Sequence, residues 1–241
     1  LSIGTSGASL SRAFFDATSN DRVVVFSLRL PRVLLGAVAG GGLAAVGVAF
    51  QAILRNPLAE PYILGVSGGA ALGATVAIAL GVASTTLLGA EVLPLVALAS
   101  GLGATAFVYA LARRTGGSTS ILLAGVVVNA IASAAITFLK TLVPERVAQD
   151  ILFWLVGFLD APASPAALPL VAMYVAIGAA VLLRDAGRLN LLALGSEQAS
   201  HLGVDVGALE RRTLVACSLV VGAIVSVTGL IGFVGLIVPH V

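Results

Sequence analysis

Apolar runs separated by short polar breaks fill most of the chain. A helix that crosses a membrane needs about 20 mostly apolar residues. Runs of about this length or longer cover residues 33–54, 62–90, 92–112, 121–139, 166–183 and 213–241. The last run is long and broken by glycines, so we expect it to bend back, which gives six or seven spans. The pattern predicts an all-α, polytopic membrane helix bundle that forms a single transmembrane domain over residues 1–241.

Composition supports the membrane prediction and excludes several other classes. The 241 residues are 59% hydrophobic and 10% charged, with a mean hydropathy of +1.11, whereas soluble domains carry about 25% charged residues. Cys217 is the single cysteine, and His201 and His240 lie far apart, so we predict no metal site and no cofactor. The net charge of +2 without a basic and aromatic cluster predicts no nucleic-acid partner.

The arginines predict the orientation, because Lys and Arg in short loops favour the cytoplasmic side. If the first run crosses from outside to inside, seven arginines lie inside, against Lys140 and Arg146 outside. The inner set is Arg55, Arg113, Arg114, Arg184, Arg188, Arg211 and Arg212. This places residues 184–212 in the cytoplasm. It also leaves Arg12, Arg22, Arg29 and Arg32 outside, where they need a purpose.

The motif "NPLAEP" interrupts two apolar runs. Pro57 and Pro61 lack amide hydrogens and disfavour helical geometry in the preceding residue, so the first helix must end near Leu54. Non-helical backbone near membrane depth persists only where protein or a water-filled cavity satisfies it. We therefore predict a hairpin that positions a glycine-lined helix beside a conduit, with close helix packing as the alternative for the glycines. The conduit or hairpin residues are Asn56, Pro57, Gly65, Ser67, Gly68 and Gly69.

Two further features are weaker. The spacing from Gly47 to Pro57 equals that from Gly229 to Pro239, which suggests the inverted repeats of many transporters. The proline-rich segment 142–168 contains "ILFWLVGFL", which is too short to span. We expect a periplasmic helix near the outlet with Trp154 as an anchor at the membrane surface, and an outer gate is the alternative role.

Five blocks of sequence, in this order, resemble the permease subunits of bacterial ABC importers for iron siderophores, haem and vitamin B12. The blocks are "RLPRVLLGAVAGG", "QAILRNPLAEPYILGVSGGAALGA", "STSILLAGVVVNA", "LALGSEQASHLGVD" and "GLIGFVGLIVPH". The resemblance implies the type II ABC importer fold with ten helices, of which about seven to eight would be present. It therefore implies a fragment truncated at both ends, as the first residue Leu1 and the apolar end at Val241 also suggest.

The resemblance also implies roles for residues at both predicted membrane faces. Arg29 and Arg32 match basic residues that dock a periplasmic or lipid-anchored substrate-binding protein, and snorkelling at a helix end is the alternative. Thr119 and Ser120 match the cytoplasmic gate, and their hydroxyls would also cap the following helix.

The segment "SEQASHLG" resembles the coupling motif of importers, Glu-Ala-Ala followed by three residues and Gly. Glu197, Ala199 and Gly203 match, whereas Gln198 departs from the middle alanine. The resemblance implies that residues 184–212 form a cytoplasmic coupling loop, in which a short helix ended by Gly203 fits the ATPase. An ordinary amphipathic connector is the alternative.

These observations predict a multi-pass permease in the bacterial inner membrane that imports an iron chelate, haem or cobalamin. The chain has no phosphate-binding loop with Gly-Lys-Ser or Gly-Lys-Thr, so it would not be an enzyme, and a separate ABC ATPase would hydrolyse ATP. A second permease copy, forming a homodimer, and membrane lipid are the other expected partners. The main alternative is an ion- or proton-coupled secondary transporter, which would place ionisable side chains within its spans. Apart from His240, the predicted spans have none; an intramembrane enzyme or a scaffold fits less well.

Overall fold

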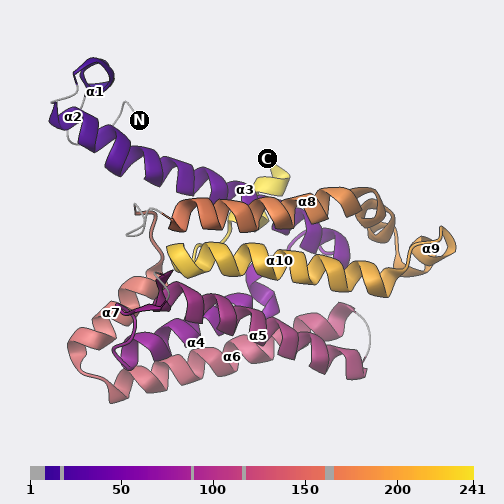
Figure 1. Ribbon diagram of the computed structural model, residues 1–241. Helices are drawn as coiled ribbons and strands as arrows, with labels where there is room; N and C mark the ends of the chain where they lie inside the picture. The colour runs from indigo at the N-terminus through magenta and orange to yellow at the C-terminus, as the bar shows by residue number, and fades with distance from the viewer. Residues whose placement is uncertain (1–8, 17–18, 88–89, 116–117, 161–165) are drawn as a thin grey trace.

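The computed structural model describes residues 9–16, 19–87, 90–115, 118–160 and 166–241. Within these ranges the protein is a helical bundle with one short β-hairpin (Figure 1). The α-helices are α1 (Leu10–Phe15), α2 (Asn20–Val23), α3 (Leu30–Leu54), α4 (Val66–Ala79), α5 (Val92–Thr115), α6 (Ser118–Leu142), α7 (Glu145–Val156), α8 (Ala167–Ala193), α9 (Ser196–His201), α10 (Val206–Thr228) and α11 (Val234–Ile237). The π-helix η1 (Val24–Arg29), the 3-10 helices η2 (Pro61–Leu64) and η3 (Val238–His240), and the antiparallel strands β1 (Thr86–Leu87) and β2 (Ala90–Glu91) complete the described elements.

The long helices form two groups that meet at α10. Helices α3, α8 and α10 pack on one another, while α4, α5 and α6 pack together on the other side of α10 (Figure 1). Helix α10 is the most enclosed span, with 72% of its most apolar 18-residue window buried. Its buried residues include Cys217, Val220, Val221 and Ile224, so α10 carries much of the core.

Five helical segments among the described residues are long and apolar enough to cross a membrane. They are Asn20–Leu54, Val92–Ala112, Ser120–Leu142, Ala167–Ala193 and Val206–Thr228. The prediction of an all-α, multi-pass bundle is therefore confirmed. The predicted span over residues 62–90 was too long, because η2 precedes α4, the β-hairpin follows it, and α4 itself has 14 residues.

Helix α8 extends well beyond the predicted limit at residue 183. It continues to Ala193 because Leu182, Leu189 and Leu192 keep an apolar, buried stripe at helical spacing. The segment 184–212 is consequently mostly helical, and it consists of the end of α8, all of α9 and the start of α10.

The predicted bend in the last apolar run is also present. Helix α10 ends at Thr228, residues 229–233 are not helical, and α11 begins at Val234. The Gly229–Phe233 stretch thus brings the chain back toward α3, with which α11 packs.

Arg22, Arg29 and Arg32 lie on one long helical segment, and Arg12 lies on the separate helix α1. Residues Asn20–Leu54 form one continuous helical segment of 35 residues, which at 1.5 Å per residue is about 52 Å long. The π-helix η1 accommodates Pro31, which lies two residues beyond its end. The last bond of η1 runs from the Leu30 N–H to Val25 O, five residues earlier. The wider π turn makes room for a proline ring that would otherwise meet the preceding turn.

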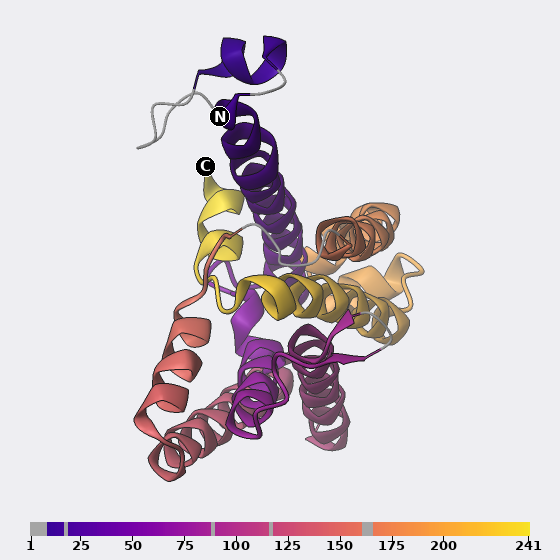
Figure 2. The same cartoon turned by 60° about the vertical axis from the view of Figure 1, so that its left-hand side comes forward.

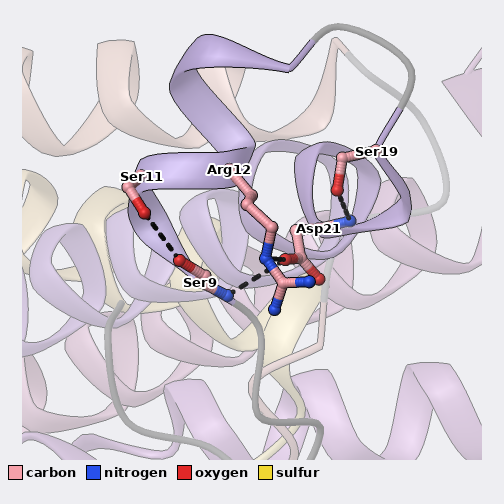
Figure 3. Close-up of polar contacts among 5 residues, drawn as sticks. All are labelled: Ser9, Ser11, Arg12, Ser19 and Asp21. Carbon is pink, nitrogen blue, oxygen red and sulfur yellow. Dashed lines mark hydrogen bonds and ion pairs between the residues drawn. The ribbon is translucent and has the colours of Figure 1, made fainter.

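Helix α1 folds back against the start of this long segment, at the tip seen in Figure 2. Asp21 organises the contact, because its Oδ2 accepts from Ser9 N at 3.2 Å and pairs with Arg12 Nε at 3.1 Å (Figure 3). Ser19 caps α2 by accepting from Asp21 N at 3.1 Å. Arg22 lies over the Phe26 ring at 5.8 Å. Arg12 and Arg22 therefore have contacts within this N-terminal unit.

Candidate functional site

The hairpin after α3 begins with a sharp turn. Arg55 adopts a left-handed conformation (φ +48°) and ends α3. Asn56 then closes the turn, because its Oδ1 accepts from Leu58 N at 2.9 Å and its carbonyl accepts from Ala59 N at 3.0 Å. The predicted helix end at Leu54 and the hairpin are both present, and Asn56 and Pro57 are exposed.

The same hairpin supports the broken backbone between α10 and α11. The Tyr62 hydroxyl donates to Ile231 O and accepts from Ile231 N, the latter at 2.8 Å. Glu60 Oε1 accepts from Phe233 N at 2.7 Å. Side chains of the hairpin and of η2 thus satisfy backbone groups of the break between α10 and α11, as an apolar environment requires. Sequence reasoning missed both roles, although the matched glycine–proline spacing related these two segments.

The predicted conduit residues of α4 and its approach lie mostly inside the bundle. Gly65, Ser67 and Gly69 are buried, and Gly68 is partly buried. Ser67 Oγ donates to Tyr62 O at 3.2 Å, and Asn129 Nδ2 of α6 donates to the same carbonyl at 2.8 Å.

Gly68 and Gly69 lie where α4 approaches its neighbours. A side chain at Gly68 would collide with Asn129 of α6, and one at Gly69 would collide with Ser100 and Ala104 of α5. Gly69 also lines an apolar groove of about 390 Å³ between α4, α5 and α6. Close helix packing accounts for these contacts, and a role in lining a cargo path stays a prediction.

Helix α9 has a well-defined stop that explains two of the three coupling-motif residues. Gly203 is left-handed (φ +82°), its N–H bonds to Ser200 O at 2.9 Å, and Val204 N bonds to Ala199 O at 3.0 Å. This is a Schellman motif, in which a glycine ends the helix and an apolar contact forms across the turn. Ala199 and Val204, which occupy the two positions of that contact, are both buried.

The remaining residues of α9 face outward. Glu197, Gln198 and His201 are exposed. A side chain at Gly195, which is left-handed (φ +140°), would collide with Gln198. The Gln198 side chain therefore covers the start of the helix, in a position where the motif has alanine. The arrangement offers an exposed carboxylate on a short helix at one end of the α8–α10 pair (Figure 1).

The predicted gate residues lie in the first turn of α6. Ser120 is partly buried beside the buried Ile121. Thr119 lies in the helix, but its side chain is not among those that the structure describes. The gating role stays a prediction.

Arg32 forms an ion pair with Asp160, a residue that sequence reasoning missed. Both side chains are exposed, and with Leu28 and Arg29 they line a depression of about 320 Å³. A partner that binds Arg32 must therefore compete with Asp160. The docking role of Arg29 and Arg32 stays a prediction.

The expectation for Trp154 was wrong. Trp154 is only 5% exposed. Helix α7 packs on α4, and the chain that follows α7 is tied to the end of α10, where Phe158 N donates to Thr228 O at 2.7 Å. The exposed apolar side chains of α7 are instead Leu152, Phe153 and Val156. An aromatic residue at the membrane surface would remain accessible to lipid, whereas this one is part of the core.

No group of three or more His, Cys, Asp or Glu side chains that could hold a metal ion occurs in the described residues. His201 is exposed on α9, and His240 Nε2 lies 3.0 Å from Pro57 O. Neither histidine faces a second ligand in these contacts.

The fold and the exposed helix between two spans are those of a multi-pass membrane transport protein. Residues 1–241 match the FecCD transport family over their whole length, so the chain belongs to this family. The resemblance drawn from the five sequence blocks is thereby confirmed.

Two relatives of this chain are named as permease proteins of transport systems, in agreement with the family match. The cobalamin import system permease protein BtuC of Halobacterium salinarum is 41% identical over 231 residues, which are 94% of this chain and 60% of that protein. The hemin transport system permease protein HmuU of Yersinia pestis is 36% identical over 233 residues, covering 95% of this chain and 69% of that protein. The chain thus spans about three fifths of the length of the cobalamin relative.

A solved structure confirms the fold. The inward-facing conformation of a metal-chelate type ABC transporter superposes with a TM-score of 0.86 and 33% identity, covering 100% of this chain and 74% of that one. The type of bundle predicted from sequence is therefore correct.

Proposed function

We propose that this chain is the permease part of an ABC importer that moves an iron chelate, haem or cobalamin across a bacterial inner membrane. The observation that carries the proposal is α9, a short exposed helix between two long spans in a chain that belongs throughout to a transport family. Relatives named for cobalamin and hemin transport support the cargo class.

The partners follow from the same proposal. A separate cytoplasmic ATPase binds α9 and supplies the motion, and an external binding protein delivers cargo near Arg29 and Arg32. A second copy of the permease completes the path as a homodimer. Glu197 is the exposed contact of the coupling helix, while Ala199 and Gly203 maintain the turn that presents it.

The test is transport by the full-length protein in vesicles with its ATPase and binding protein. We expect ATP-dependent uptake of one among cobalamin, haem and a ferric siderophore, and loss of coupling when Glu197 is replaced by alanine. Glu197→Ala is a clean variant because the side chain is exposed and makes no contact in the α9 turn. Uptake driven by an ion or proton gradient without nucleotide would support the secondary-transporter alternative and refute the proposal.

A further inference from the structure

A carboxylate interrupts the buried leucine stripe of α8. Leu182, Asp185, Leu189 and Leu192 follow one another at spacings of three and four residues, so they share one face of the helix. Asp185 is only 2% exposed. A buried charge is costly unless it is paired and hydrogen-bonded, so the position needs a reason.

Two arginines pair with this carboxylate from different helices. Arg188 Nη1 lies 2.8 Å from Asp185 Oδ1, and Arg212 Nε lies 3.4 Å from Asp185 Oδ2. Arg188 belongs to α8 itself, one turn further on. Arg212 belongs to α10, so its contact joins the two helices that flank α9.

The two helices also meet at a second point further from α9. Gly178 of α8 packs so closely against Val220 and the Ala216 carbonyl of α10 that a side chain there would collide with them. Contacts at Gly178 and at Asp185 together fix both the spacing and the rotation of α8 against α10. Figure 1 shows the pair running side by side into α9.

We infer that Asp185 is a positioning residue that locks α8 to α10 through Arg212, so that a displacement of α9 moves both helices as one rigid body. This inference rests on the proposed coupling role of α9. Replacing a buried ion pair by apolar side chains is often neutral or stabilising. Stability therefore gives little reason to place Asp185 among leucines, whereas a fixed geometry between the two helices does.

The first test compares Asp185→Leu and Arg212→Gln in the full-length permease, assembled in vesicles with its ATPase and binding protein. Both variants should assemble and hydrolyse ATP, but the cargo moved per ATP should fall about threefold or more. The double variant should be no worse than Asp185→Leu alone, because that change already removes the contact with Arg212. Arg212→Lys should restore part of the coupling, and the exposed Arg184→Gln, with the same change of charge as Arg212→Gln, should leave it unchanged.

The second test measures the helix pair directly. Spin labels at Gly187→Cys and Gly207→Cys report the distance between α8 and α10, because both positions are exposed, and the native Cys217 is fully buried. We expect a broader distance distribution in Asp185→Leu and Arg212→Gln than in the parent or in Arg184→Gln.

Unchanged cargo per ATP together with an unchanged distribution in Asp185→Leu would overturn the inference. So would a fall in ATP hydrolysis and transport that merely follows the loss of folded protein. A parent protein without ATP-dependent uptake would refute the proposed function instead, and the spin-label result would still decide whether Asp185 locks the two helices.

Discussion

At the scale of single residues, the hydroxyl of Tyr62 forms two hydrogen bonds to backbone that is not helical. The hydroxyl accepts a hydrogen bond from the N–H of Ile231 and donates one to its C=O, while Glu60 accepts one from the N–H of Phe233. These groups belong to backbone that has left the helix, and leaving them unpaired in an apolar interior would be costly. The two residues therefore hold together segments that are far apart in the sequence.

Tyr62→Phe should destabilise the protein by about 1–3 kcal/mol, because it leaves the Ile231 backbone groups without their partner. Thermal unfolding in detergent or nanodiscs measures the loss. Tyr174→Phe is the matched control, since the partly buried Tyr174 makes no such bond to a broken helix. An equal loss in both variants would show that the hydroxyl of Tyr62 does not support the α10–α11 junction.

At the scale of elements, the turn that ends α9 fixes the length of this helix, and the helix presents an exposed carboxylate. Its Schellman motif needs glycine at Gly203 and a small apolar residue at Ala199, which are two of the positions that define the coupling pattern. Glu197 takes no part in the turn and stays exposed. The pattern thus combines a helix stop with one outward carboxylate.

Gly203→Ala should loosen α9, because alanine in the left-handed region costs about 1–2 kcal/mol. Hydrogen exchange should then accelerate about 5- to 30-fold for the amides that close the turn, Gly203 and Val204. Gly187→Ala is the control, since Gly187 lies in α8 with open space around it, and alanine favours a helix. Equal exchange in the parent and in Gly203→Ala would contradict the structural role of this glycine.

The sequence was sufficient for the elements that depend on apolar length and on proline. It predicted the end of α3, the spans α5 and α6, and the break after α10, because each follows from local chemistry. It misplaced the ends of α4 and α8, because tertiary packing decides where a short or charged helix continues. Contacts between distant residues, such as Tyr62 with Ile231 or Arg32 with Asp160, carry no local signal. Trp154 was misplaced for the same reason.

At the scale of the whole molecule, an exposed ion pair lies at the depression that we propose as the docking site. The long N-terminal helical segment carries Arg29 and Arg32 where η1 meets α3, and Asp160 pairs with Arg32 beside them. An exposed pair of this kind adds little stability, but complementary charges set the rate of association with a partner. In the proposed docking of an acidic binding protein, Asp160 would therefore moderate its attraction to Arg32.

Asp160→Asn should raise the association rate of an acidic binding protein by a factor of about 2 to 10, because it releases Arg32. Binding kinetics on nanodisc-embedded permease measure the change, which should shrink as salt is added. Asp150→Asn on α7 removes an equal charge without freeing Arg32, so any excess in Asp160→Asn reports the released arginine. Equal rates in both variants would exclude this role for Asp160.

The π turn before Pro31 has a geometric consequence for the tip of the molecule. A regular helix advances about 100° per residue, so the extra residue held in Val24–Arg29 rotates everything before it by about that angle. Deleting one residue from this turn would swing α1 and its phenylalanines around the axis while leaving α3 in place. The single extra residue in η1 thus sets the direction in which the surface of α1 faces.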